Sequence, residues 1–175
     1  MLKQIFIING SASSNSSNEK LIRLFVQQTK NIFSCTVFNE LKSLPHFNPE
    51  LSADNPPAII QSFRQSIANA DAVLICTPEY VFSIPSGLKN CLEWCVATMV
   101  FTDKPLGIIT ASAHGQKGHA ELQLIMQTLS ARFTEATTLL IQGIKGKMNE
   151  KGMLTDKTTV ENLNSFIKAF TNLVQ

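Results

Sequence analysis

The sequence has little charge of either sign. Only 16% of its 175 residues are charged, and 15 basic against 13 acidic side chains give a formal net charge of +2. A basic field that would attract nucleic acid is therefore missing, and so is the acidic field of a solvating tail. We expect no nucleic acid and no other polyanion among the partners.

Long apolar runs are also missing. The longest ones, such as Ala72 to Cys76, are far shorter than the ~20 residues that cross a bilayer. The N-terminus lacks the charged, apolar and cleavage regions of a signal peptide, and the four cysteines lie mostly in apolar or helix-like stretches. These absences predict a cytoplasmic protein that does not associate with a membrane.

Several catalytic signatures are absent as well. There is no Walker loop, no Gly-x-Gly-x-x-Gly fingerprint, no Cys-x5-Arg phosphatase loop and no Gly-x-Ser-x-Gly elbow. Nucleoside triphosphates and nucleophilic hydrolysis are therefore disfavoured. Cys91 and Cys95 have an i, i+4 spacing that could suit a metal or a redox pair, but no second ligand pair has a fitting spacing. We interpret them as buried structural thiols and expect no metal.

What the chain does have is a regular alternation of short apolar runs and helix patterns. Its 44% hydrophobic content suffices for a substantial core, and residues 1–175 are expected to form one domain. The patterns predict strands at residues 5–8, 35–38, 72–77, 106–110 and 137–141, and helices around residues 21–25 and at 57–69, 86–98, 119–132 and 160–173.

This alternation predicts an α/β fold with right-handed crossovers. Five strands match a flavodoxin-like three-layer sandwich, with a parallel sheet of order 2-1-3-4-5 and helices on both faces, better than the six-stranded dinucleotide-binding fold. The segment from Leu41 to Pro57 contains four prolines and is the one long irregular connection. Because long connections are often functional, we expect it to run near a site.

A polar loop from Gly10 to Asn18 follows the first strand and carries five serines in seven residues. It leads into a helix, so hydroxyls and unpaired backbone N–H groups converge where the helix dipole also favours an anion. A phosphate site is one interpretation. An ordinary capped helix explains the composition equally well.

The residues of this loop and of a second one resemble the NADPH-dependent FMN reductase family, which includes quinone, chromate and azo-dye reductases. Gly10-Ser11-x-x-x-x-Ser16-x-Asn18-x-x-Leu21 matches the spacing of that family's phosphate loop. Thr77-Pro78-Glu79-Tyr80-x-x-Ser83-Ile84-Pro85-x-x-Leu88-Lys89-Asn90-x-x-Glu93-Trp94 matches its flavin-ring loop and the following helix without a gap. With a third loop at Ser112 to Gly118 and a tail around Gly152, the resemblance covers essentially the whole chain.

The resemblance implies non-covalent FMN, reduced by NADPH or NADH, in a homodimer or homotetramer. The residues expected to bind the cofactor are Ser11, Ser13, Ser16, Ser17 and Asn18 at the phosphate, Pro78, Glu79, Tyr80, Val81, Phe82 and Ser83 at the ring, and Ser112 and His114 in the third loop. For His114 a helix cap or an exposed position is the alternative. No catalytic side chain is expected, because the cofactor carries the chemistry.

Two positions depart from the family pattern. The family commonly has Arg where Ser13 stands, so hydroxyls, amides and the helix dipole are left to hold the phosphate. It usually has Asn-Gly or Asn-Tyr where Val81-Phe82 stand, which removes a polar side chain but not the backbone N–H groups. These departures keep a degenerate flavin-binding regulator open as an alternative.

The leading hypothesis is an enzyme that passes two electrons from NAD(P)H through FMN to a small acceptor: a quinone, an azo compound, a metal oxyanion or free flavin. A flavodoxin-type electron carrier is the other alternative, although such carriers are usually strongly acidic. We also expect Tyr80, Phe82 and the apolar helix from Leu88 to Val96 to form a surface patch that a second subunit covers.

Overall fold

A computed structural model describes residues 1–175 and contains a five-stranded sheet in which every pair of neighbours is parallel. The strands are β1 (Lys3–Asn9), β2 (Phe33–Phe38), β3 (Ala72–Thr77), β4 (Leu106–Ser112) and β5 (Thr138–Gln142). Their spatial order is β2-β1-β3-β4-β5. The predicted order 2-1-3-4-5 is confirmed.

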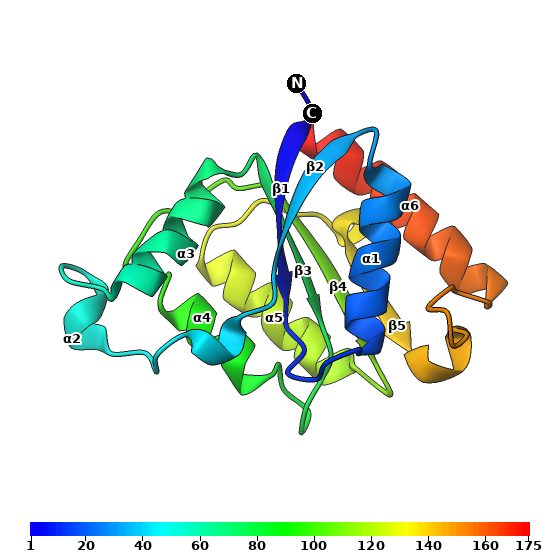
Figure 1. Ribbon diagram of the computed structural model, residues 1–175, viewed down its shortest axis with the longest axis horizontal. Coiled ribbons are helices and arrows are strands. Elements are labelled where there is room, and N and C mark those ends of the chain that lie inside the picture. Colours follow the sequence, from blue (N-terminus) through cyan, green and yellow to red (C-terminus); the bar gives the residue numbers. More distant parts are fainter.

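Helices cover both faces of the sheet (Figure 1). They are α1 (Ser17–Thr29), α2 (Pro49–Ser52), α3 (Ala58–Asn69), α4 (Ser86–Glu93), α5 (Gln116–Thr128) and α6 (Lys157–Val174), with short 3-10 turns η1 (Leu41–Ser43), η2 (Glu135–Thr137) and η3 (Ile144–Lys147). The helices α1 and α6 lie on one face, and α3, α4 and α5 lie on the other. The three-layer flavodoxin-like architecture is thus confirmed.

Two sequence-based boundaries differ from the structure. The helix predicted over residues 86–98 ends at Glu93, because the N–H groups of Cys95 and Val96 bond to carbonyls only three residues back and the chain tightens into turns. The connection from Leu41 to Pro57 is less irregular than expected. It holds η1 and the four-residue α2, which Asn48 caps through its side chain.

The core lies on both sides of the central strand β3, in which all six residues are buried. Aliphatic side chains from α3, α4 and α5 fill one side, and phenylalanines of α1 and α6 fill the other. Cys91, Cys95 and Trp94 belong to the first cluster. None of the helices combines the length and the apolar character that a membrane crossing requires.

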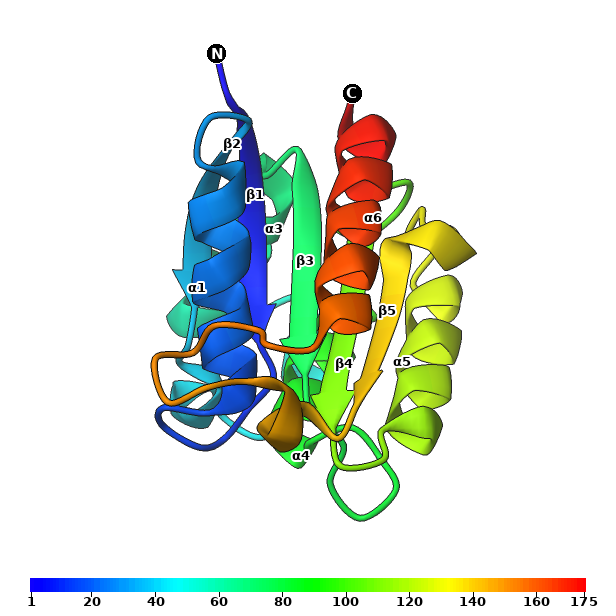
Figure 2. The same ribbon diagram turned by 90° about the vertical axis from the view of Figure 1, so that its right-hand side faces the viewer.

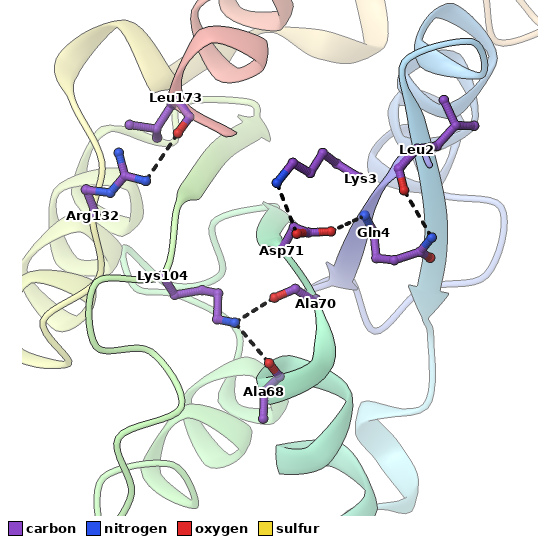
Figure 3. Close-up of polar contacts among 9 residues, drawn as sticks. All are labelled: Leu2, Lys3, Gln4, Ala68, Ala70, Asp71, Lys104, Arg132 and Leu173. Carbon is purple, nitrogen blue, oxygen red and sulfur yellow. Dashed lines mark hydrogen bonds and ion pairs between the residues drawn. The ribbon is translucent and has the colours of Figure 1, made fainter. Parts of the chain in front are cut away.

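Polar contacts fix the amino ends of the strands (Figure 3). Asp71, just before β3, accepts a hydrogen bond from the Gln4 N–H of β1 at 2.7 Å and pairs with Lys3 at 3.3 Å. The Gln4 N–H is the main reason why the pKa of Asp71 lies below its ordinary value. Lys104, just before β4, donates to the carbonyls of Ala68 and Ala70 at the end of α3. This end of the sheet is closed by structural contacts.

The opposite end is where the connecting loops gather. Both termini lie beside the amino ends of the strands, and the loops that follow β1, β3, β4 and β5 meet below the carboxyl ends (Figure 2). In a doubly wound sheet this is the edge at which ligands bind.

Candidate functional site

The loop between β1 and α1 leaves several backbone N–H groups free. Ser16 caps α1, with its side-chain oxygen accepting the Glu19 N–H at 3.1 Å. The N–H groups of Ser14, Ser16 and Ser17 have no acceptor in the protein. Because these donors surround a helix N-terminus, the loop has the donor set that a phosphate requires.

Asn18 holds this loop against the sheet. Its side chain is buried, donates to the Ala111 carbonyl at 3.1 Å and accepts from the Cys76 thiol at 3.4 Å. Asn18 therefore joins α1 to the ends of β3 and β4. Burial of Cys76 raises the pKa of its thiol, so the group stays protonated as the donor.

The loop after β3 is a tight two-residue turn. The N–H and carbonyl groups of Tyr80 and Ser83 bond to each other at 2.9 and 3.0 Å. The two central residues, Val81 and Phe82, have φ angles of 51° and 58°, as a type I′ turn requires. Asn and Gly suit these angles, whereas a β-branched valine is strained there. The side chains of Val81 and Phe82 are 95% and 72% exposed.

Glu79 locks this turn to α5. The first residue before α5, Gly115, has no capping side chain, and the carboxylate of Glu79 takes that place by accepting the N–H groups of Gly115 at 3.1 Å and Gly118 at 2.8 Å. Burial raises the pKa of Glu79. The two N–H groups, a third from Lys117 and the charge of His114 lower the pKa by more than burial raises it, so it lies below its ordinary value. Glu79 is therefore ionised at neutral pH, and its carboxylate holds the loop after β3 against the start of α5.

Two further side chains complete the connection between the turn and α5. The Ser83 hydroxyl and the Ile84 N–H both bond to Glu121, at 2.7 and 2.9 Å. Ser112, at the end of β4, donates to the Glu79 carbonyl at 3.4 Å. The turn after β3 is thereby fixed from both neighbouring elements.

Tyr80 bridges the turn to the first loop. Burial raises the pKa of its phenol, but the hydroxyls of Ser11 and Ser13, the Ala12 N–H and the charge of Lys42 lower it, so that the pKa lies below its ordinary value. The phenol therefore lies beside the serine loop.

These loops enclose a cavity of about 860 Å³. It is lined by residues 11, 13–18 and 20 after β1, 78–80 after β3, 111–113 at the end of β4, and 143–146 and 148–150 after β5. Its walls combine the unpaired N–H groups of the serine loop with residues at the ends of the strands. The volume suits a mononucleotide with a three-ring base, and the donor set suits its phosphate, so the residues present fit FMN.

Nine of the residues expected from the sequence line this cavity: Ser11, Ser13, Ser16, Ser17, Asn18, Pro78, Glu79, Tyr80 and Ser112. The other four expected residues do not. Val81 and Phe82 form the exposed tip of the turn, the Ser83 side chain faces Glu121, and His114 is exposed beside Glu79.

The wall formed by residues 143–150 was missed from the sequence. It contains η3 and carries Lys145 and Met148, while Lys20 of α1 lines the cavity beside it. The only local signal is Gly143, which takes a positive φ of 64° just after β5. Lys20 and Lys145 are the cations that line this cavity, beside the loop in which Ser13 replaces the family's usual Arg.

The contacts of Glu79 lead to a prediction about stability. We expect Glu79→Gln to lower the free energy of unfolding by about 1–2 kcal/mol at neutral pH, since an amide offers one acceptor oxygen and no charge to two N–H donors. Because the folded pKa of Glu79 is depressed, its stabilisation is present above the unfolded pKa and is lost as the pH falls through the folded pKa.

The difference between Glu79→Gln and the parent should therefore shrink toward about pH 3 in urea unfolding of the flavin-free protein. Glu161→Gln, on the exposed side of α6, is the control. A difference that stays constant between neutral and acidic pH would contradict this role for the carboxylate.

The doubly wound sheet, with a phosphate-type loop after β1 and a second loop after β3, defines a flavodoxin-like flavoprotein. Residues 4–145 match the family described as NADPH-dependent FMN reductase. The chain belongs to that family. It is accordingly an oxidoreductase that works with FMN and a nicotinamide cofactor, as its sequence motifs predicted.

Relatives support this assignment along the whole chain. A subunit of NADH:(hydroxy)cinnamate reductase from Vibrio ruber is 33% identical over 93% of this chain and 83% of its own length. An NADPH:quinone oxidoreductase from Arabidopsis thaliana is 28% identical over 99% and 94%. The structure of the flavoenzyme NAD(P)H:(acceptor) oxidoreductase FerB from Paracoccus denitrificans is similar with a TM-score of 0.86, 25% identity and coverage of 99% and 97%.

Proposed function

We propose that this protein reduces quinones with NAD(P)H, using FMN held in the 860 Å³ cavity. The observation that carries the proposal is that the free N–H groups of Ser14, Ser16 and Ser17 line the same cavity as the fixed segment of Glu79 and Tyr80. Relatives named quinone reductases, from Escherichia coli and Pseudomonas putida among others, support the choice of acceptor.

Bound FMN supplies the ability to take a hydride from a nicotinamide and to deliver two electrons to an acceptor. The protein's own part is to bind and to orient. Free N–H groups at the start of α1 hold the phosphate, and the backbone of Pro78 to Tyr80, fixed by the carboxylate of Glu79, positions the ring edge. Overall, NAD(P)H, a quinone and one proton give NAD(P)⁺ and a hydroquinone. The proton comes from solvent.

The purified protein tests the proposal directly. Its absorbance spectrum should be that of an oxidised flavin, and heat-released cofactor should run with FMN in chromatography. Oxidation of NADH and NADPH should then be measured with a quinone, an azo dye, chromate and free FMN as acceptors. The quinone should give the highest kcat/KM. A colourless protein, or one that turns over an azo dye and ignores quinones, overturns the proposal.

The kinetics should be ping-pong. The chain offers a flavin cavity but no second dinucleotide fingerprint, so nicotinamide and acceptor are expected to approach the same open ring face in turn. Parallel lines are expected in double-reciprocal plots of rate against NAD(P)H at several quinone concentrations. Intersecting lines would mean that both substrates bind together, and the single shared position would be wrong.

We further propose a homodimer formed through the exposed turn. The helix expected from Leu88 to Val96 contributes less to the apolar surface patch than the sequence predicted, because Leu88 and Leu92 are buried within the subunit. In this part of the chain, from Tyr80 to Met99, the exposed large apolar side chains are Tyr80, Val81, Phe82, Val96 and Met99. The chain has a mass of 19.3 kDa, and light scattering at micromolar concentration should give twice that mass. The variant Phe82→Asp should give monomers. A monomeric parent protein would refute the dimer.

We also propose a cytoplasmic location, which fits the four free cysteines.

One observation favours a second candidate function, the delivery of electrons to a partner protein. The exposed Val81 and Phe82 occupy a strained turn directly after Tyr80, which lines the cavity, and the relative from Vibrio ruber is named as a subunit. In stopped-flow mixing, NADH would then bleach the flavin quickly while every small acceptor reoxidised it slowly. Fast reoxidation by quinone supports the enzyme that acts alone.

A further inference from the structure

A second cavity, of about 660 Å³, adjoins the flavin cavity. The two cavities share Ser11, Ser13, Ser14 and Tyr80 in their walls. The remaining walls of the second cavity come from the connection after β2, with Asn39, Lys42 and His46, and from the start of α4, with Ser86, Gly87 and Asn90. A molecule held in this cavity therefore borders the flavin site directly.

The wall formed by the connection after β2 is held rigidly in place. Asn90 of α4 accepts the Phe47 N–H at 2.8 Å and donates to the Pro45 carbonyl at 3.0 Å. The indole N–H of Trp94 donates to the same carbonyl at 2.9 Å, and the ring of Phe47 packs edge-on against Trp94 at 5.4 Å. In Figure 1 this connection runs beside α4. The clamp holds the exposed His46 at the rim of the cavity.

The ionisable side chains of the cavity favour an anion. Lys42 lies close enough to Tyr80 for its charge to act on the phenol, and it has no carboxylate partner. The one acidic side chain in the walls is Glu19, which pairs with Arg23 and accepts the Asn15 N–H. Because Glu19 is paired, Lys42 is the charge in these walls without a partner of opposite sign, and it makes the cavity attractive to an anion, with the ring of His46 as a further hydrogen-bonding group at the rim.

We propose that this cavity is an anion subsite, in which Lys42 and His46 hold a phosphate, sulfonate or carboxylate group of the molecule that exchanges electrons with the flavin. The inference rests on the proposed function. The same group could belong to the nicotinamide donor, as its 2′-phosphate, or to an acidic acceptor. Substrates that carry such a group are then preferred over neutral substrates of the same ring system.

The test compares Lys42→Gln with the parent holoenzyme in buffer of low ionic strength. Two pairs of substrates differ in one anionic group: 1,2-naphthoquinone-4-sulfonate against 1,2-naphthoquinone, and NADPH against NADH. We expect Lys42→Gln to shift the KM ratio within one pair by about fivefold, at the expense of the anionic member. A shift in the quinone pair assigns the subsite to the acceptor, and a shift in the nicotinamide pair assigns it to the donor.

Lys168→Gln, which removes a charge from exposed α6, is the matched control and should shift neither ratio. Binding is measured separately by NMR, with the ring signals of His46 assigned through His46→Gln. Addition of naphthoquinone sulfonate or NADP⁺ to the oxidised protein should move these signals in the parent and not in Lys42→Gln. Unchanged KM ratios together with an unmoved His46 would overturn the subsite. If the protein lacked flavin, the proposed function would fail and the titration alone would decide on the subsite.

Discussion

Gly10→Ala is expected to lower the free energy of unfolding by about 3 kcal/mol or more. Gly10 follows β1 directly, and its N–H donates to the Cys76 carbonyl of β3 at 2.8 Å. A Cβ atom at this position would lie 2.6 Å from the Thr77 Cβ, would touch the Thr77 hydroxyl, and would meet a Leu88 methyl group at 3.1 Å. Thr77 and Leu88 are completely buried, so neither can move without disturbing the core.

Urea unfolding of the flavin-free protein measures this effect. Gly146→Ala is the matched control, because no atom lies within 4 Å of the added methyl group there. The Gly10 variant should also be purified without flavin, since displacing β1 from β3 moves the serine loop away from Tyr80. Equal stability of the two glycine variants would show that the strand ends are not as close as the structure places them.

Ser16→Asp is expected to weaken FMN binding by about 100-fold, which corresponds to ~2.7 kcal/mol. Aspartate caps a helix as well as serine does, so α1 keeps the bond to the Glu19 N–H and the flavin-free protein keeps its stability. The new carboxylate, however, stands among the N–H groups proposed to bind the phosphate. Riboflavin, which has no phosphate, should lose little affinity.

Fluorescence titration of flavin-free protein with FMN and with riboflavin gives both affinities. Asn48→Asp introduces the same charge at the cap of α2, away from the flavin cavity, and should leave both values as they are in the parent. If Ser16→Asp lowered the two affinities equally, a displaced loop would explain the loss. If FMN bound with parental affinity, its phosphate would lie elsewhere.

The parts of this structure that the sequence predicted are those that local patterns specify. Unbroken apolar runs identify β1, β3 and β4 because strands buried on both faces carry no polar positions. The helix after β3 was predicted too long because Trp94 and Cys95 continue the apolar pattern after the backbone has left the helix. Hydrophobic periodicity reports burial, and burial continues through the turns that follow Glu93.

The site likewise contains residues that sequence motifs identify and residues that only the tertiary structure brings in. The serine loop and the Pro78–Tyr80 segment carry motifs, and the cavity contains both. No motif marks residues 143–150, Lys42 or His46, because their positions depend on tertiary contacts. His46 reaches the cavity rim only through the clamp that Asn90 and Trp94 form on its neighbours. Those two residues stood out in the sequence as part of a motif, but their partners could not be read from it.

The flavin cavity draws its walls from segments that begin at residue 11 and end at residue 150. These segments lie at the carboxyl ends of β1, β3, β4 and β5, so FMN is expected to bind only after those four strands have paired. Such long-range pairing is slow. Until the strands have paired and FMN has bound, the chain is exposed to proteases and to aggregation. A ligand that binds only the folded chain adds ~2.7 kcal/mol of stability at 100 times its Kd. The supply of flavin in the cell is thereby expected to set how much of this protein survives synthesis.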